Sequence, residues 1–101
     1  MMRQYLIRDI ERAACSVFGV TKDEMRSKSR LRRISRPRQI VMYLARELTP
    51  ASYPMIGRHF GGRDHTTILH GKRKIAELLR TTNTMAGHVD DVRQKLRERA
   101  S

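Results

Sequence analysis

A run of five polar residues, 63–67 (RDHTT), follows a glycine pair and opens a stretch of helical periodicity. An Asp carboxylate accepts a hydrogen bond from the amine of cytosine, and Thr hydrogen-bonds to base edges and packs its methyl against that of thymine. A His ring hydrogen-bonds to a base edge or a phosphate, and a helix N-terminus favours a phosphate. These residue types at the start of one helix favour contact with nucleic acid. Asp64 and Thr66 would also serve as caps of the helix, and the two roles are compatible.

A second group of residues that could bind a ligand is the basic run that begins at Arg26 and ends at Arg38. The chain carries 22 Lys and Arg against 10 Asp and Glu, a formal charge of +12, and most of the excess lies between residues 21 and 80. Like charges this close repel one another unless an anion lies against them. The pattern therefore favours a polyanionic partner, and the competing interpretation is a basic surface that only keeps the protein soluble.

The elements that must position these residues are predicted to be helices, since apolar residues recur at helical spacing and no strand pattern occurs. A first helix ends near Gly19, and Thr21 with Glu24 forms a capping box for a short second helix. Residues 28–36 have no apolar period and are predicted to form a loop. The next helix is predicted to begin at Pro37, because proline is favoured in the first helical turn.

The second half of the chain predicts three more helices. Ser52 caps a short helix over 53–60, and a long helix follows over 64–81. Residues 81–84 are predicted to be a linker, and an amphipathic helix runs on from Met85. The two helices on either side of the glycine pair form a helix-turn-helix, a motif whose second helix enters the major groove of DNA.

The predicted fold is all-α, with about six helices around one core, in a single domain over residues 1–101. That length leaves no room for a nucleotide-hydrolysing module of roughly 200 residues beside a second domain. No phosphate-binding glycine loop occurs, so no ATP module and no cofactor are expected. No apolar run approaches the ~18 residues of a membrane span. The single cysteine, Cys15, excludes an internal disulfide and favours a reducing, cytoplasmic location.

The segment IGRHFGGRDHTTILHG (56–71) resembles the signature of the C-terminal DNA-binding domain of the bacterial replication initiator DnaA. The stretch SKSRLRRISRPRQIVMYLARELT (27–49) is similar to the basic loop and following helix of that domain, and the helix order extends the resemblance over nearly the whole chain. The resemblance implies a Trp-repressor-like helix-turn-helix and a double-stranded DNA partner of the TTATCCACA type, the DnaA box. It also implies origin binding, replication initiation or transcription regulation by site occupancy, a nucleoid-associated location, and other replication proteins as further partners. The chain looks like a free-standing copy of the domain, and its sequence does not separate a natural small protein from an excised one.

The resemblance implies roles for ten residues. Arg30 aligns with the loop arginine that enters the minor groove, where narrow A·T-rich segments attract Arg. The residues implied to contact bases in the major groove are Asp64, His65, Thr66 and Thr67. The residues implied to hold the phosphate backbone are Arg38, Gln39, Arg46, Arg63 and, as a further candidate, Lys74.

Four positions depart from the family pattern, one of which, Arg33, adds charge to the basic loop. Tyr53 and Met55 stand where the family often has Leu and Glu, beside the backbone-contacting end of the first motif helix. Gly71 replaces a common Ala inside the recognition helix, a change expected to cost roughly 1 kcal/mol. The base-contacting residues are unchanged, so a similar core target is expected.

Other functions are alternatives to sequence-specific DNA binding. An adaptor or scaffold would dock replication proteins through the first or last helix. Non-specific nucleic-acid or RNA binding is disfavoured by an aromatic content of 5%. An enzyme is not expected, because a catalytic triad needs a pre-organised cleft. A metal site is not expected either, because His65 and His70 lie on different faces of their predicted helix and no cysteine or carboxylate cluster joins them.

Overall fold

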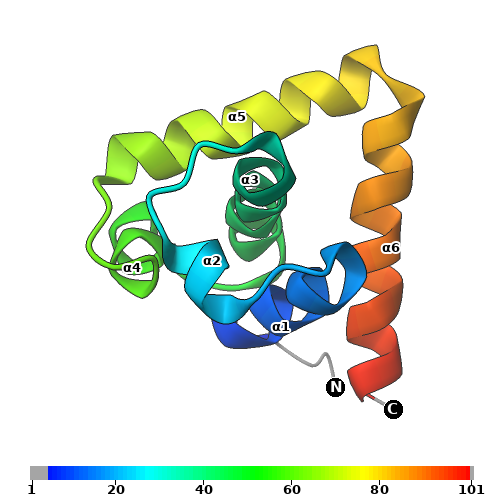
Figure 1. Ribbon diagram of the computed structural model, residues 1–101, viewed down its shortest axis with the longest axis horizontal. Helices are drawn as coiled ribbons and strands as arrows, with labels where there is room; N and C mark the ends of the chain where they lie inside the picture. The colour runs from blue at the N-terminus through cyan, green and yellow to red at the C-terminus, as the bar shows by residue number, and fades with distance from the viewer. Residues whose placement is uncertain (1–4, 101) are drawn as a thin grey trace.

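Helix α3 (Arg32–Leu48) runs through the middle of the computed structural model, which describes residues 5–100. Helix α5 (His65–Thr81) packs across one side of α3, and α1 (Ile7–Phe18) packs across the opposite side (Figure 1). The described residues contain no strand, so the predicted all-α fold is confirmed. The predicted domain also takes in residues 1–4 and 101, which lie outside the described part.

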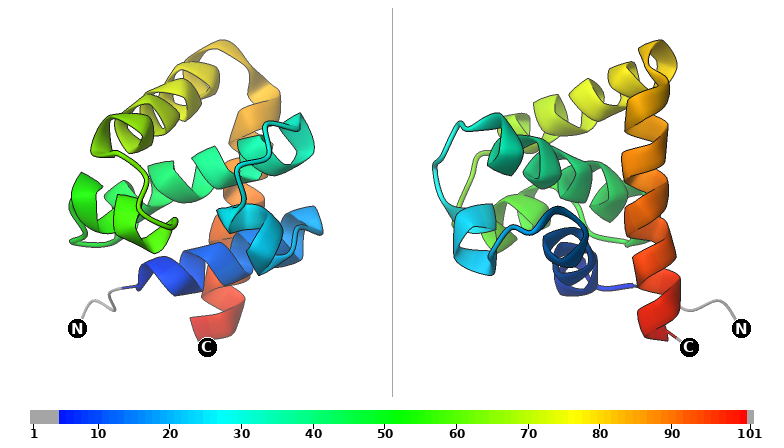
Figure 2. Two further views of the ribbon diagram at one scale, coloured as in Figure 1. Left: turned by 60° about the vertical axis from the view of Figure 1, so that its left-hand side comes forward. Right: turned by 45° about the vertical axis from the view of Figure 1, so that its right-hand side comes forward.

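Three further helices surround this stack. Helix α6 (Asn83–Ala100) follows α5 around a sharp corner and packs against α1 and α5 (Figure 2). Helix α4 (Tyr53–His59) packs against the first part of α5, and α2 (Lys22–Arg26) lies against α1 and α3. No helix within the described residues is both long and apolar enough to span a membrane.

The core lies between α3 and the helices α1 and α5 on either side of it, and α6 covers it where it packs against α1 and α5. Apolar side chains of α3 are fully buried, and the predicted inner face of α6 is buried as well. Burial of each such aliphatic side chain contributes about 1.5–3 kcal/mol to folding. The residues that form this core include Ile10, Ile40, Val41, Leu44, Ile68, Ile75, Val89, Val92 and Leu96.

Four predicted helix ends are confirmed. Gly19 adopts a left-handed conformation (φ 65°) at the end of α1. Thr21 and Glu24 form the capping box of α2, with reciprocal hydrogen bonds of 3.0 Å. Ser52 caps α4 through the N–H of Met55 (3.3 Å). Asp64 caps α5.

Two predicted boundaries are wrong. Helix α3 begins at Arg32, five residues before Pro37, so only the first part of the predicted loop 28–36 lies outside a helix. Ile34 is 4% exposed and belongs to the buried face of α3, although cations surround it in the sequence. Pro37 lies in the second turn, where it offers no N–H to the carbonyl four residues earlier. The predicted linker 81–84 shrinks to Thr82, because α6 begins at Asn83.

Candidate nucleic-acid interface

The turn between α4 and α5 is built on glycines. Gly61 and Gly62 have φ values of 83° and 87°, which favour glycine. The carbonyl oxygen of Gly57 accepts hydrogen bonds from the N–H groups of Gly62 (3.0 Å) and Arg63 (2.9 Å). A Cβ at Gly57 would collide with the carbonyl oxygen of Arg63. Gly57 therefore fixes how α5 leaves α4. Sequence reasoning did not single it out, although a glycine inside a short helix was a signal for such a close approach.

The start of α5 is organised by its own residues. Asp64 Oδ1 accepts hydrogen bonds from the N–H of Thr66 (2.7 Å) and from its hydroxyl (2.6 Å). These bonds from Thr66 lower the pKa of Asp64, which therefore stays ionised at neutral pH. The side chains of residues 64–67 are all exposed. Capping consumes part of the hydrogen-bonding capacity of Asp64 and Thr66, but the second carboxylate oxygen of Asp64 and the ring of His65 remain at the surface.

The loop over residues 27–31 is held by a buried arginine. Arg38 is 5% exposed, and its guanidinium donates hydrogen bonds to three backbone carbonyls, those of Met25 (2.8 Å), Ser29 (3.0 Å) and Glu24 (3.3 Å). Burial, together with the nearby Arg63, lowers the pKa of Arg38. The sequence predicted a phosphate contact for Arg38, whereas the structure directs its guanidinium into the protein, where it joins the end of α2 to the middle of the loop.

Arg63 joins this loop to the helix-turn-helix. Its Nη2 donates a hydrogen bond to the carbonyl oxygen of Ser27, and burial lowers its pKa. The sequence predicted a phosphate contact for Arg63. In the structure Arg63 is half-buried, and its guanidinium bonds to the backbone of the protein itself. The exposed Arg30 lies in the loop so held. Arg38 and Arg63 thus set the position of the loop that presents Arg30.

A groove of about 530 Å³ lies between the start of α3 and α5. Arg30 and Thr67 both line it, so the structure brings the predicted minor-groove arginine and one of the four predicted major-groove residues to one concave surface. The other three, Asp64, His65 and Thr66, do not line the groove. Gln39 and Lys74, both predicted to hold phosphate, line it too. The sequence analysis did not assign a role to five other lining residues, Arg32, Ser35, Arg36, Met42 and His70.

Gly71 lets the two walls of this groove approach. A Cβ at Gly71 would lie 2.5 Å from the sulfur of Met42 and 3.5 Å from Cγ of Gln39. The glycine that departs from the family pattern is therefore matched by a methionine on α3. An alanine at this position would require the flexible Met42 side chain to move.

Arg46 lies elsewhere, near the end of α3. Its guanidinium carbon lies 4.6 Å from the centre of the Tyr53 ring, and its Nη1 donates to the carbonyl oxygen of Ala51 (2.7 Å). Arg46 is exposed, and the Tyr53 ring restricts its orientation. It does not line the α3–α5 groove, so the predicted phosphate contacts divide between two places on the surface.

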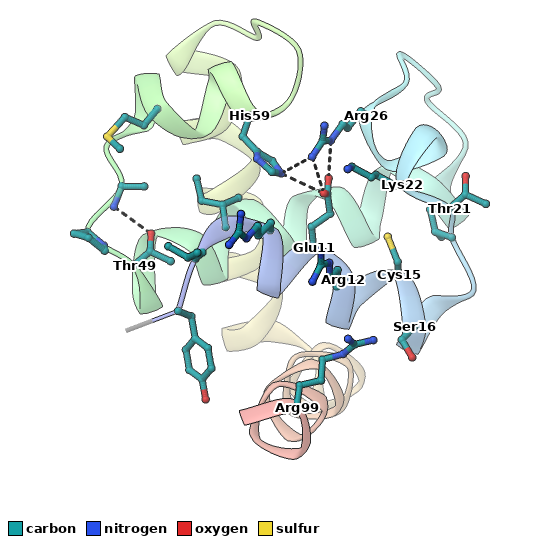
Figure 3. A pocket seen from close by; sticks show the side chains of 18 residues that line it. Glu11, Arg12, Cys15, Ser16, Thr21, Lys22, Arg26, Thr49, His59 and Arg99 are labelled. Atoms are coloured by element: carbon teal, nitrogen blue, oxygen red, sulfur yellow. Dashed lines mark hydrogen bonds and ion pairs between the residues drawn. The ribbon is translucent and has the colours of Figure 1, made fainter. Parts of the chain in front are cut away.

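A buried carboxylate of α1 bonds to side chains from α2 and α4. Glu11 is 2% exposed, and Arg26 donates to its two oxygens (3.1 and 3.0 Å), while His59 Nε2 lies 3.3 Å from Oε1 (Figure 3). Burial raises the pKa of Glu11, but the hydrogen bonds from His59 and Arg26 outweigh it and lower the pKa overall. Sequence reasoning missed this cluster, whose signal was a glutamate on the apolar face of the first helix. Within the described part of the chain, no three His, Cys, Asp or Glu side chains are grouped so as to hold a metal ion.

Comparison with known proteins agrees with this geometry. Residues 7–75, from the start of α1 into α5, match the family model described as the bacterial dnaA protein helix-turn-helix. The chain belongs to this DnaA helix-turn-helix family. The predicted family resemblance is thereby confirmed.

Its similarity to whole DnaA proteins is substantial but covers only part of them. The chain is 48% identical over 94 residues to the chromosomal replication initiator protein DnaA of Cereibacter sphaeroides, which is 93% of this chain and 21% of that protein. It is 46% identical over 94 residues to the DnaA of Mesorhizobium japonicum, covering 93% of this chain and 19% of that protein. It is 44% identical over 90 residues to the DnaA of Sphingopyxis alaskensis, covering 89% and 20%. The chain spans about a fifth of the length of these relatives.

Proposed function

We propose that this protein binds double-stranded DNA sequence-specifically at sites of the DnaA-box type, TTATCCACA. The observation that carries the proposal is the shared groove: the exposed Thr67 near the start of α5 and the exposed Arg30 line one basic concave surface, and the exposed Asp64, His65 and Thr66 precede Thr67 directly in the chain. A helix in the major groove with an arginine in the adjacent minor groove is a known way to read a duplex from two sides.

Each residue has a place in this mechanism. Asp64, His65, Thr66 and Thr67 contact base edges and methyl groups in the major groove. Arg30 enters the minor groove at the A·T-rich end of the site. Gln39 and Lys74 hold phosphates along the groove, and Arg46 holds a phosphate near the start of α4. Arg38 and Arg63 contribute by holding the loop, because their guanidinium groups already bond to backbone carbonyls.

The biological role in this proposal is occupancy of DnaA boxes. The relatives carry the name chromosomal replication initiator. We infer that this chain shares their sites and acts on replication initiation, or on transcription where boxes lie in promoters. Bound to a box, the chain would compete with any other protein that needs the same site.

The test is fluorescence anisotropy with a labelled TTATCCACA duplex and a scrambled duplex of equal composition, each at two salt concentrations. We expect a preference for the box that persists at the higher salt, because base contacts do not depend on counterion release. Equal binding of both duplexes that disappears as salt rises would overturn the proposal, since only the electrostatic part of binding would remain.

A further inference from the structure

A second groove, of about 870 Å³, runs along α1 (Figure 3). It is bordered by α4, by the start of α2 and by Arg99 of α6. None of the residues that line it comes from α3 or α5, and none of them is a proposed DNA contact. A molecule in this groove would therefore leave the groove between α3 and α5 free, and the proposed DNA contact nearest to it is Arg46, which bonds to the carbonyl of the lining residue Ala51.

The groove exposes apolar surface. The described part of the chain has three exposed large apolar side chains, and two of them, Leu6 (52%) and Met55 (47%), line this groove. The third is Leu31 in the basic loop. Ile7, Val20 and Ala51 add to the apolar lining. Apolar side chains gathered in one concavity, and edged by charged ones, are typical of a site for a protein partner.

The charge around this apolar floor has one sign. A single carboxylate, Glu11, lines the groove; it is 2% exposed and is already paired with the guanidinium of Arg26, with Nε2 of His59 3.3 Å from Oε1. The other charged residues that line the groove are all cations, Arg8, Arg12, Lys22, Arg26 and Arg99. Arg8 and Arg12 are exposed and lie one helical turn apart on α1. An occupant must therefore present apolar groups flanked by carboxylates.

We infer that this groove is a docking site for an acidic amphipathic helix of a partner protein. Helix α1 has 12 residues and offers a track about 18 Å long, which suits three turns of such a helix. A second copy of the chain fits less well, because its own net charge is +12. A nucleic acid fits less well too, because only one aromatic ring besides His59, that of Tyr5, lines the groove and no base-stacking platform results.

The single cysteine provides the reporter. Cys15 lines the groove and is partly exposed. Burial raises the pKa of its thiol, which slows modification by N-ethylmaleimide, and mass spectrometry follows the rate of that modification. The probe is a synthetic helical peptide of about 16 residues with Leu along one side and Glu along both flanks. Its control is the same peptide with Lys in place of every Glu.

We expect the Glu peptide to bind with a Kd in the range of about 10–100 μM and to slow modification of Cys15, while the Lys peptide does neither. Arg12→Glu should weaken the affinity of the protein for the Glu peptide roughly tenfold. Arg80→Glu is the matched control, since it makes the same charge change at an exposed position at the far end of α5 and should have little effect. Both variants should keep the same affinity for the box duplex, which keeps this test separate from that of the proposed function.

Three outcomes would overturn the inference. The first is a failure of the Glu peptide to protect Cys15. The second is an equal loss of peptide affinity in Arg12→Glu and Arg80→Glu, which would mean attraction to net charge alone. The third is equal protection of Cys15 by the box duplex or by phosphatidylglycerol vesicles, which would assign the groove to a nucleic acid or to a membrane surface.

Discussion

The two elements proposed to read DNA are positioned in different ways. The start of α5 is organised locally, because Asp64 and Thr66 bond to each other two residues apart. The loop that presents Arg30 is organised from a distance, by Arg38 and Arg63, which reach it from α3 and from the turn before α5. A local cap can be altered with little effect elsewhere. A loop held by distant side chains links DNA binding to the stability of the whole fold.

The largest expected effect comes from the glycine on which both regions depend. Gly57→Ala should lower the free energy of unfolding by about 3 kcal/mol, because the new methyl group displaces the backbone at Arg63 and with it the bond to the loop. Urea denaturation measures the loss. Gly87→Ala in α6 is the control, since nothing lies within 4 Å of a Cβ there. The control should be neutral or more stable by up to about 1 kcal/mol. Equal stability of the two variants would contradict the prediction.

The next prediction distinguishes Arg38, which holds the loop over residues 27–31, from Arg30, which that loop exposes. Arg38→Leu should lower the free energy of unfolding by about 2–3 kcal/mol, because buried carbonyls lose charged hydrogen-bond donors. It should also weaken preference for the A·T-rich end of the box. Arg30→Ala should weaken the same preference without a change in stability, since Arg30 is exposed. Thermal denaturation measures the stability of both variants, and duplex titration measures their preference for the A·T-rich end of the box. An unchanged melting temperature for Arg38→Leu would show that the loop does not need this anchor.

At the locally organised end, capping and base contact can be separated. Thr66→Ala should lose about 1–3 kcal/mol of discrimination between the box and single-base variants of it. Asp64→Asn keeps an oxygen able to cap α5 but removes the carboxylate, so it should change base preference with little effect on stability. Competition titrations against a set of single-base variants measure both. If Thr66→Ala left the base preference intact, α5 would not be the recognition helix.

The smallest effect is expected away from both regions. Arg46→Ala should weaken binding to every duplex alike and reduce the slope of log affinity against log salt by about one. Tyr53→Leu keeps the arginine but removes the ring beneath it, and should give a smaller loss with an unchanged slope. Titrations over a series of salt concentrations test the pair. A sequence-dependent loss in Arg46→Ala would contradict its assignment to phosphate.

The same contrast explains what the sequence could predict. The caps at Thr21, Ser52 and Asp64 were predictable because each uses residues two or three positions apart. The start of α3 was not, since Leu31 makes no side-chain cap and the surrounding cations obscured Ile34. The one-residue connection before α6 was not predictable either, because the polar run 81–84 has the composition of a linker although α6 begins within it, at Asn83.

In the candidate site, too, the locally organised residues could be predicted from the sequence and the residues bonded to a distant segment could not. The polar run 63–67 followed from residue types and from the family resemblance, and the structure exposes residues 64–67 of it. The internal bonds of Arg38 and Arg63 could not be predicted, because their acceptors are backbone carbonyls in another segment, and carbonyls leave no trace in residue identity. An arginine in a basic run gives the same sequence signal whether it faces solvent or the protein.

The bond from Arg63 to the carbonyl of Ser27 has a consequence for the kind of information that the protein takes from DNA. It fixes the separation between the loop and the start of α5 in the free protein, before any duplex is bound. Under the proposed function, that separation corresponds to a set number of base pairs between the minor-groove and the major-groove contacts. The protein would then select for spacing as well as for base identity, and a box lengthened by one base pair between those contacts would be rejected although every base in it is correct.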